Sequence, residues 1–380
     1  MTWKIPLFKI YWDNQDLEAV LSVITSGVEW AVGPRVIEFE KALADFIGTK
    51  YAAVFNSGTS ALHAAFLAHK IREGDEVIVP SFTFIATANA PLFVGAKPIF
   101  ADIEEETLGL DPEDVKRKIT QKTKAIIAVH YAGCPCKIRE LREIADDYKM
   151  LLIEDAAEAF GAKIFGKKVG TFGDSSIFSF CQNKIITTGE GGAVLTNSKE
   201  IYERLKLIRS HGRLEAQEYF SSSSSGEYIT LGYNFRLSNI LASLGISQLK
   251  KVDKIIEMRR EIALKMTEKL SKINVIKPPI PPKGYFHVYQ MYTIRTPWNI
   301  RNSLLKYLAS KGIMTKIYFE PLHLTKFYKE LFGYKDSQLP VTEKVSKEVL
   351  TLPLYPTLTD NEINYISNNV IEFVRLKRGM

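Results

Sequence analysis

The first stretch with residue types suited to chemistry is Asn56-Ser57-Gly58-Thr59-Ser60-Ala61-Leu62, which follows an apolar run and opens a helix-like segment. A helix N-terminus carries free backbone N–H groups and the positive end of the helix dipole, so it suits a phosphate group. Gly58 would let the backbone approach such a ligand, and Ser57 or Thr59 could add hydroxyl bonds. An ordinary helix N-cap, which serine and threonine favour, explains the stretch equally well on its own.

The second candidate is Asp155, which lies where the apolar stretch before it ends, within Ile153-Glu154-Asp155-Ala156-Ala157-Glu158. Ligands of open α/β sheets bind at the carboxyl ends of the strands. A carboxylate at that position could keep a pyridine nitrogen protonated, which turns the ring into an electron sink. An N-cap aspartate is the simpler interpretation of this residue taken alone.

The third candidate is Lys184, a single lysine between an apolar stretch ending at Phe180 and the glycine-rich turn Thr188–Gly192. A lysine held among apolar groups near a cationic ring loses its proton more readily and can act as a nucleophile. Most lysines are merely solvated. The order of the three features along the chain, a phosphate turn, a strand-end aspartate and then a strand-end lysine, favours a chemical role for Lys184.

Cysteine and histidine spacing predicts no metal site. Three cysteines cannot form a disulfide framework, and a Cys-Pro-Cys spacing is not a usual zinc pair. The histidines other than His323 show no metal-ligand spacing either. These residues are Cys134, Cys136, Cys181, His63, His69, His130, His211 and His287. We expect a reducing cytoplasm.

Charge and hydropathy predict a globular cytoplasmic protein without nucleic-acid or membrane partners. The net charge of +7 would suit an anionic ligand or nucleic acid, but the basic residues are spread along the chain with no basic, aromatic-rich stripe. A solvated surface rich in charged residues explains the balance better. The N-terminal stretch lacks the pattern of a signal peptide, and no run reaches the ~20 apolar residues of a membrane span.

The elements that must position the three candidates follow from hydrophobic patterning between residues 50 and 200. Short β-rich runs alternate with helix-like segments, which is typical of an α/β domain with a mostly parallel sheet covered by helices on both faces. The expected strands are Tyr51–Phe55, Glu76–Val79, Pro98–Ala101, Ala125–His130, Leu151–Glu154, Ser176–Phe180 and Gly192–Thr196. The expected helices are Ser60–Lys70, Phe84–Val94, Pro112–Ile119 and Arg139–Tyr148.

A second, smaller α+β domain is expected towards the C-terminus. A charged helical stretch, Leu249–Ser271, leads into the proline-rich run Lys277–Pro282. We place the boundary so that residues 1–250 form the large domain and residues 251–380 the small one. In the small domain we expect a strand over Phe286–Thr293 and helices over Asn302–Lys311 and Thr359–Arg375.

The ordered motifs resemble those of the DegT/DnrJ/EryC1/StrS sugar aminotransferases, which belong to the fold-type-I pyridoxal-phosphate enzymes. The resemblance runs nearly from end to end, and its set of ordered motifs is specific. Besides the three stretches above, it rests on Gly74–Pro80, Thr83–Ala90, Gly173-Asp174, Phe178–Phe180 and Gly232–Ser238. It implies the fold-type-I arrangement, with a seven-stranded sheet in the large domain.

The resemblance also implies roles for the cofactor-binding residues. Lys184 would form the Schiff base (internal aldimine) with pyridoxal 5'-phosphate, and Asp155 would pair with the pyridine nitrogen. Gly58, Thr59 and Ser179 would hold the phosphate. Phe84 would stack on the ring face, although as an aromatic residue on a helix it fits a core position equally well. The family often has glutamine or histidine where this chain has Glu158, which would lie beside the ring hydroxyl.

Three further residues carry over from the family pattern. Asn234 would reach the phosphate from the neighbouring subunit, so the active site would be shared in a homodimer. From its residue type alone, Asn234 fits a turn. Arg236 would help to place substrate or to order its loop, and His323 would contact substrate. A lone histidine in a loop is more often structural.

The implied reaction moves an amino group from glutamate, or less favourably glutamine, to a ketosugar carried on a nucleoside diphosphate, in amino sugar biosynthesis. A sugar dehydratase is a rival, but in those relatives a histidine replaces the lysine, and Lys184 argues against it. Cyclitol-ketone aminotransferases share the lysine and stay open. A regulatory protein that has lost catalysis would have no reason to keep Lys184, Asp155 and the phosphate turn together.

Overall fold

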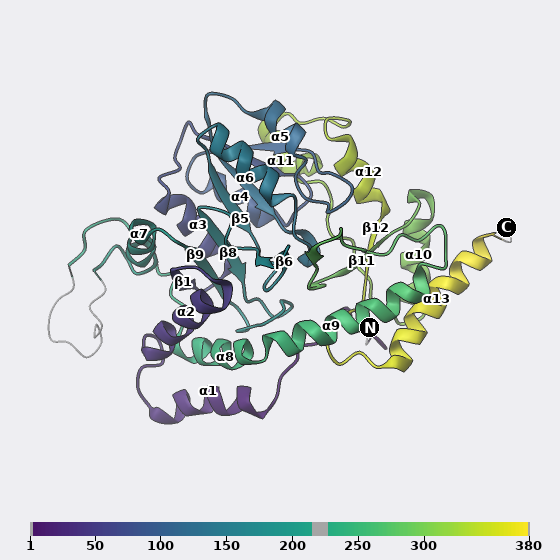
Figure 1. Cartoon of the computed structure of the whole chain (residues 1–380), viewed down its shortest axis with the longest axis horizontal. Coiled ribbons are helices and arrows are strands. Elements are labelled where there is room, and N and C mark those ends of the chain that lie inside the picture. The colour runs from purple at the N-terminus through teal and green to yellow at the C-terminus, as the bar shows by residue number, and fades with distance from the viewer. Residues whose placement is uncertain (1–2, 215–226, 379–380) are drawn as a thin grey trace.

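The computed structural model describes residues 3–214 and 227–378, and its centre is a seven-stranded sheet (Figure 1). The sheet order is β1-β9-β8-β5-β4-β2-β3. The strands are β1 (Tyr51–Phe55), β2 (Glu76–Pro80), β3 (Lys97–Ala101), β4 (Thr123–Val129), β5 (Leu151–Asp155), β8 (Ser175–Ser179) and β9 (Gly192–Thr196). β9 runs antiparallel to both of its neighbours, and the other pairs are parallel. The mostly parallel sheet and its seven strands agree with the prediction.

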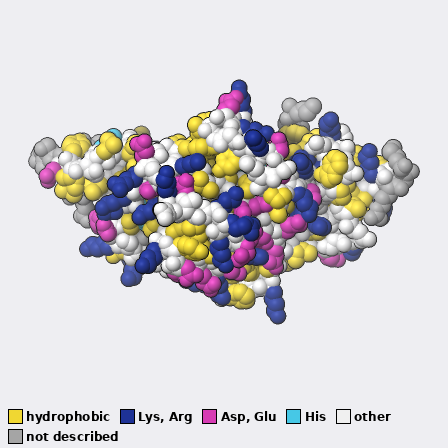
Figure 2. Space-filling model, turned by 90° about the horizontal axis from the view of Figure 1, so that it is seen from above, with side chains coloured by type: hydrophobic (Ala, Val, Ile, Leu, Met, Phe, Trp, Pro, Cys, Tyr) yellow, Lys and Arg dark blue, Asp and Glu magenta, His cyan; other side chains and the backbone are white. Residues whose placement is uncertain are grey.

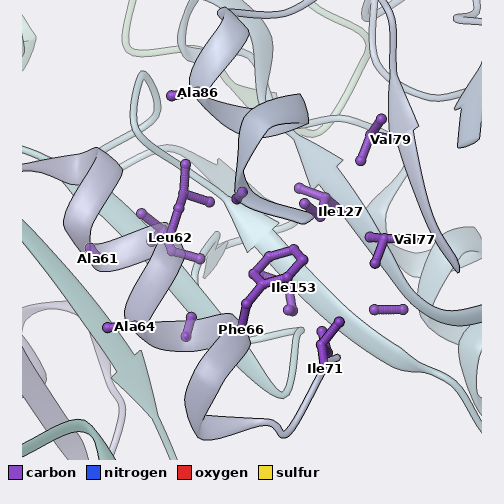
Figure 3. Close-up of a cluster of buried hydrophobic side chains, with 14 of the residues drawn as sticks. Ala61, Leu62, Ala64, Phe66, Ile71, Val77, Val79, Ala86, Ile127 and Ile153 are labelled. Carbon is purple, nitrogen blue, oxygen red and sulfur yellow. The ribbon is translucent and has the colours of Figure 1, made fainter. Parts of the chain in front are cut away.

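Helices cover both faces of this sheet, because its strands bury side chains on both sides. On one face α3 (Gly58–Ala68) packs Leu62 and Phe66 against strand residues such as Ile127 and Ile153 (Figure 3). Burial of each such side chain contributes about 1.5–3 kcal/mol. The helices α4 (Ile85–Leu92) and α7 (Lys199–Arg209) complete that layer.

The opposite face is covered by two groups of helices. One group is α2 (Pro34–Ile47) and α8 (Asn239–Lys250), whose apolar residues pack on β1 and β9. The other is α5 (Pro112–Lys118) and α6 (Ile138–Asp147), which cover β4 and its neighbours. α1 (Asn14–Ser26) packs outside α8. α1 and α2 were not among the helices that we expected from the sequence.

The C-terminal part of the chain has a hydrophobic core of its own. It contains apolar residues of α9 (Val252–Leu270), α10 (Trp298–Ser310) and α13 (Asp360–Arg378), around the pair β11 (Tyr292–Arg295) and β12 (Val349–Leu352). The remaining helices there are α11 (Lys326–Phe332) and α12 (Pro340–Glu348). α9 runs on from α8 along the lower edge of the molecule and leads into this part (Figure 1). A domain boundary between residues 250 and 251 stays a prediction.

One expected strand, Phe286–Thr293, is wrong. The structure divides it between β10 (Tyr285–Phe286), which pairs with β6 (Lys163–Ile164), and β11, which pairs with β12. β6 also pairs with β7 (Lys167–Lys168). Between β10 and β11 the backbone of Tyr289 adopts a positive φ of 51°, which no regular strand tolerates. The segment is therefore a bend with two short strands at its ends.

The surface carries charged side chains of both signs. Basic and acidic side chains lie interspersed over the face seen from above (Figure 2). Among residues 3–214 and 227–378, no helix has both the length and the apolar composition to cross a membrane. Within the same residues, no group of three or more histidine, cysteine, aspartate or glutamate side chains is arranged to hold a metal ion.

Candidate active site

The candidate residues gather at one edge of the central sheet. Because all strands except β9 run parallel, the segments that follow β1, β2, β4, β5 and β8 emerge at the same edge. β9 runs the opposite way, so it begins at this edge, where Gly192 pairs with Phe55 and Ser179. The segments at this edge are Asn56–Thr59, Ser81–Phe84, His130–Gly133, Ala156–Glu158, Phe180–Lys184 and Gly192.

The N-terminus of α3 forms a close-fitting turn around Gly58. Ser57 is the N-cap, and its Oγ accepts a hydrogen bond from the backbone N–H of Ser60 at 3.0 Å. A Cβ on Gly58 would lie 3.1 Å from Ser179 Cβ, and one on Gly192 would lie 2.5 Å from the Ser57 carbonyl oxygen. The N–H groups of Gly58 and Thr59 lie in the first turn, so they have no hydrogen-bond acceptor within the helix. This turn has the donors and the backbone access that a phosphate needs.

Asp155 ends β5 and is nearly fully buried. Its Oδ2 accepts a hydrogen bond from the Thr87 hydroxyl at 2.7 Å, and its Oδ1 accepts one from the Ala157 N–H at 3.2 Å. The Thr83 hydroxyl lies 3.0 Å from that of Thr87. No helix begins at Asp155, so the N-cap interpretation is wrong. The carboxylate is held rigidly at the strand end, where it can pair with a protonated ring nitrogen.

Lys184 lies beside Glu158, with 3.7 Å between Nζ and Oε1. The other carboxylate oxygen, Oε2, accepts a hydrogen bond from the Ala132 N–H at 2.9 Å. Burial raises the pKa of the Glu158 carboxyl, and the Lys184 ammonium partly opposes that shift. Both side chains are largely buried, with 15% and 12% of their surfaces exposed. The structure thus places Lys184, Glu158 and Asp155 at the same edge of the central sheet.

Phe84 provides an exposed aromatic surface at this edge. It precedes α4, and 58% of its surface is exposed, unusual for a large aromatic side chain. Its ring lies 6.3 Å from the ring of Phe319. The exposure excludes the alternative of a core aromatic. A phosphate turn, a buried strand-end carboxylate, a lysine and a free aromatic surface together fit pyridoxal phosphate.

Asn234 and Arg236 lie on a segment next to the phosphate turn. Asn234 is exposed, and its carbonyl oxygen accepts a hydrogen bond from the Asn56 side chain at 3.4 Å. Arg236 Nη1 donates to Ser210 Oγ at 3.3 Å. Residues 215–226, which precede this segment, lie outside the described residues.

His323 lies inside the protein in this structure, and the contact with substrate that the resemblance implied stays a prediction. Its side chain is fully buried. Nδ1 lies 2.7 Å from Ser81 Oγ, and Nε2 lies 3.3 Å from Glu343 Oε1. Both ring nitrogens are therefore used inside the protein, and burial lowers the pKa of the imidazole. This histidine ties the segment after β2 to α12.

The structure adds site residues that sequence reasoning missed. Thr87 of α4 holds Asp155, and Thr83, which lies before the helix begins, contacts the Thr87 hydroxyl. Glu154 is a fully buried carboxylate that accepts hydrogen bonds from Gly170, Phe172 and Gly173 N–H groups, each at 2.7 Å. Its partner His130 lies at 3.1 Å. This carboxylate fixes the turn Gly170–Gly173, which leads into β8.

Comparison with known proteins gives consistent matches over almost the whole chain. The model of the DegT/DnrJ/EryC1/StrS aminotransferase family matches residues 11–371. The chain is 38% identical over 370 residues to GDP-perosamine synthase of Escherichia coli O157:H7, covering 97% of this chain and 98% of that protein.

Solved structures agree with this fold. PseC of Helicobacter pylori, an aminotransferase involved in the biosynthesis of pseudoaminic acid, superposes with a TM-score of 0.90 at 32% identity, over 97% of this chain and 98% of that one. The PMP form of a putative sugar aminotransferase from Streptococcus pneumoniae has a TM-score of 0.91 at 26% identity, with 97% and 98% covered. These likenesses confirm the fold-type-I arrangement expected from the sequence.

Proposed function

The chain belongs to the DegT/DnrJ/EryC1/StrS aminotransferase family of pyridoxal-phosphate-dependent enzymes, and we propose that it transfers an amino group from glutamate to a ketosugar linked to a nucleoside diphosphate. The products would be 2-oxoglutarate and the corresponding amino sugar nucleotide. GDP-perosamine synthases of two further bacteria, at 37% identity each, support a nucleotide-linked sugar as substrate.

The observation that carries this proposal is the convergence of Lys184, Asp155 and the Gly58 turn at one sheet edge. Each residue alone has an ordinary structural explanation. A phosphate turn at a helix N-terminus, a buried carboxylate and a partly buried lysine are the three groups that hold the two ends and the carbonyl carbon of pyridoxal phosphate. A regulatory protein without catalysis would not require all three, and a dehydratase of this family would not require Lys184.

Each residue of the site has a defined task in the proposed reaction. Bound pyridoxal phosphate supplies the electron sink for cleavage of the C–H bond at the carbon that carries the amine. Asp155, held by Thr87, keeps the ring nitrogen protonated. Lys184 would take the proton from that carbon as general base and deliver it as general acid to the carbon on the other side of the nitrogen. Ser57, Gly58, Thr59 and Ser179 hold the phosphate, and Phe84 packs on the ring.

Glu158 lies close enough to Lys184 to influence where protons reside in the site. We propose that it lies beside the ring hydroxyl. In the ionised state a carboxylate there repels a phenolate oxygen, whereas in the neutral state it donates a hydrogen bond to it. The burial that raises its pKa favours the neutral carboxyl and hence the second arrangement.

We propose further that the working form is a homodimer in which Asn234 contacts the phosphate of the neighbouring subunit. The segment around Asn234 exposes apolar side chains to an unusual extent, with Tyr228 at 61%, Ile229 at 50% and Leu231 at 79%. Exposed apolar side chains of this kind mark contact surfaces. A second copy covering them would place Asn234 at the subunit boundary. We keep a cytoplasmic location as part of this proposal.

An assay of amino transfer tests the proposed function. The purified protein, supplied with pyridoxal phosphate and glutamate, is given a panel of GDP-, UDP- and dTDP-linked ketosugars, and 2-oxoglutarate formation is coupled to a dehydrogenase. We expect turnover with at least one nucleotide-linked ketosugar, and glutamine serves as the alternative donor. Turnover of a free cyclitol ketone in preference to every nucleotide-linked sugar would overturn the substrate class.

The lysine is tested separately. Lys184→Ala should abolish transamination, and borohydride treatment should add the mass of the reduced cofactor to the Lys184 peptide of the wild type only. Full transamination by Lys184→Ala would overturn the mechanism. Lys163→Ala serves as the control, because Lys163 lies in β6, outside the site.

A further inference from the structure

The bend His287–Met291 between β10 and β11 contacts the loops that carry both Lys184 and Glu158. The side-chain amide of Gln290 donates a hydrogen bond to the carbonyl oxygen of Asn183, the residue directly before Lys184. The backbone N–H groups of Val288 and Met291 donate to the carbonyl oxygens of Gly133 and Ala132, at 3.1 and 3.2 Å. The N–H of Ala132 in turn donates to Glu158.

This bend is fixed by a buried arginine. Arg259 of α9 donates from Nε to the Tyr289 carbonyl oxygen at 2.9 Å and from Nη2 to the Gln290 carbonyl oxygen at 2.7 Å. A third bond, at 3.3 Å, goes to the Leu354 carbonyl oxygen. Burial lowers the pKa of the guanidinium to about 9. Bonds from a buried cation to main-chain oxygens support the positive φ of Tyr289, which the chain would not adopt unaided.

The bend His287–Met291 also packs closely against the neighbouring turn at Ala132 and Gly133. Gly133 has a φ of +95°, and a Cβ at this position would lie 2.7 Å from Val288 Cγ2, 2.9 Å from the Gln290 nitrogen and 3.0 Å from the Glu158 carbonyl oxygen. Three segments distant in sequence therefore meet here without space for an added methyl group. The bend, the Ala132–Gly133 turn and the Glu158 segment behave as one packed unit.

We propose that Gln290 is a positioning residue for Lys184. The carbonyl oxygen of Asn183 and the N–H of Lys184 belong to the same planar peptide group, which also contains the Cα of Lys184. Gln290 holds the oxygen of this group, and the Lys184 N–H donates to the Cys181 carbonyl oxygen at 3.0 Å. Both polar ends of the plane are thus fixed, and with them the point from which the lysine side chain extends.

The consequence concerns the cofactor linkage. Misplacement of a reacting group by about 1 Å can reduce a rate by about a hundredfold. Without the Gln290 bond, the peptide plane is free to tip about the axis through its Cα atoms, and Lys184 Nζ leaves its place beside Glu158. This inference rests on the proposed function, in which Lys184 bonds to pyridoxal phosphate.

The test compares Gln290→Met, which keeps length and removes the donor, with Thr267→Val as a matched control. Thr267 lies on α9, and its hydroxyl makes a hydrogen bond of 2.9 Å with the Tyr292 hydroxyl, away from the lysine loop. For each protein we measure the dissociation constant of pyridoxal phosphate by absorbance titration, the rate of borohydride trapping at Lys184, and the melting temperature.

We expect Gln290→Met to weaken cofactor binding about tenfold, the effect of one charge-free hydrogen bond of about 1.4 kcal/mol, and to slow trapping. Thr267→Val should lower the melting temperature with cofactor binding within about twofold of wild type. Equal cofactor binding in the two variants would overturn the inference. A wild type that is not trapped at Lys184 would instead overturn the proposed function itself, a result visible before any variant is made.

A second variant, Gln290→Glu, covers the case in which Gln290→Met fails to fold. The neutral acid can donate a hydrogen bond to the Asn183 oxygen, whereas the ionised carboxylate repels it. The ratio of variant to wild-type cofactor affinity should therefore fall as pH rises through the pKa of the introduced carboxyl. A ratio independent of pH would contradict the positioning role.

Discussion

At the scale of single residues, the groups of the proposed site that carry chemistry are held by side chains from distant parts of the chain. Asp155 ends β5, and Lys184 lies in the turn that follows β8. Thr87 and Gln290 act through contacts to residues 68 and 107 positions away, which no local pattern reveals. His323 is likewise held by a distant residue, since its partner Ser81 is 242 residues away.

The pKa of Glu158 gives a prediction at this scale. Burial raises it above the ordinary 4.5. An acid with a higher pKa in the folded than in the unfolded protein stabilises the fold below its unfolded pKa, and that contribution is lost as pH rises through the folded pKa. Glu158→Gln removes the titrating group and keeps the acceptor for the Ala132 N–H. We therefore expect the wild type to lose stability relative to Glu158→Gln as pH rises above 4.5.

Urea unfolding of the two proteins between about pH 4 and 8, at equal cofactor content, measures this difference in the free energy of unfolding. Glu38→Gln is a suitable control, because Glu38 is an exposed residue that pairs with Arg35 on the same helix. A stability difference between wild type and Glu158→Gln that stays constant with pH would show that Glu158 is not titrating in this range.

At the scale of elements, the seven strands followed from apolar runs, but the direction of β9 did not. A run such as Gly192–Thr196 is equally apolar in either direction, and its pairing with β1 and β8 is decided by the chain path after Lys184. The bend His287–Met291 was taken for part of a strand because its residues are β-rich. Its shape depends on Arg259, which lies on another element.

Gly192 is the first residue of the antiparallel strand β9, and its contact with the phosphate turn gives a prediction. A Cβ there would lie 2.5 Å from the Ser57 carbonyl oxygen and 2.6 Å from the Gly58 nitrogen, both backbone atoms of the phosphate turn. We expect Gly192→Ala to destabilise the fold by about 1–3 kcal/mol, as overpacking does, and to weaken binding of pyridoxal phosphate. Denaturant unfolding and absorbance titration measure the two effects.

Gly189→Ala is the control for this substitution, because Gly189 lies in the same turn with nothing within 4 Å of an added Cβ. Its φ of +83° means that alanine there adds backbone strain without a clash at the phosphate turn. Gly189→Ala should therefore lose stability with cofactor affinity retained. If both variants keep the affinity, the Gly192 contact does not shape the phosphate site.

At the scale of the whole molecule, the sequence predicted a mostly parallel sheet with helices on both faces, and the structure has this arrangement. The N-terminal helices α1 and α2 were not predicted, although Asp13 caps α1 and Pro34 stands at the first position of α2. α1 leaves Leu17 and Leu21 exposed at 60% and 51%, so it buries little apolar surface within its own chain, whereas α2 buries Phe39 and Leu43 fully. Amphipathic patterning is weak in a helix that buries little within its own chain.

The proposed sharing of the active site between two subunits can be tested only in the assembled dimer. If Asn234 serves the neighbouring subunit, Lys184→Ala and Asn234→Ala proteins are each impaired, but a mixed dimer contains one site with both residues intact. Equal mixing with free exchange makes half of the dimers mixed, so about a quarter of wild-type activity should return. Light scattering reports the assembly, and unfolding followed by joint refolding ensures exchange. Mixing that restores nothing beyond the sum of the two variants would place Asn234 in its own subunit's site, next to the Asn56 side chain that already contacts it.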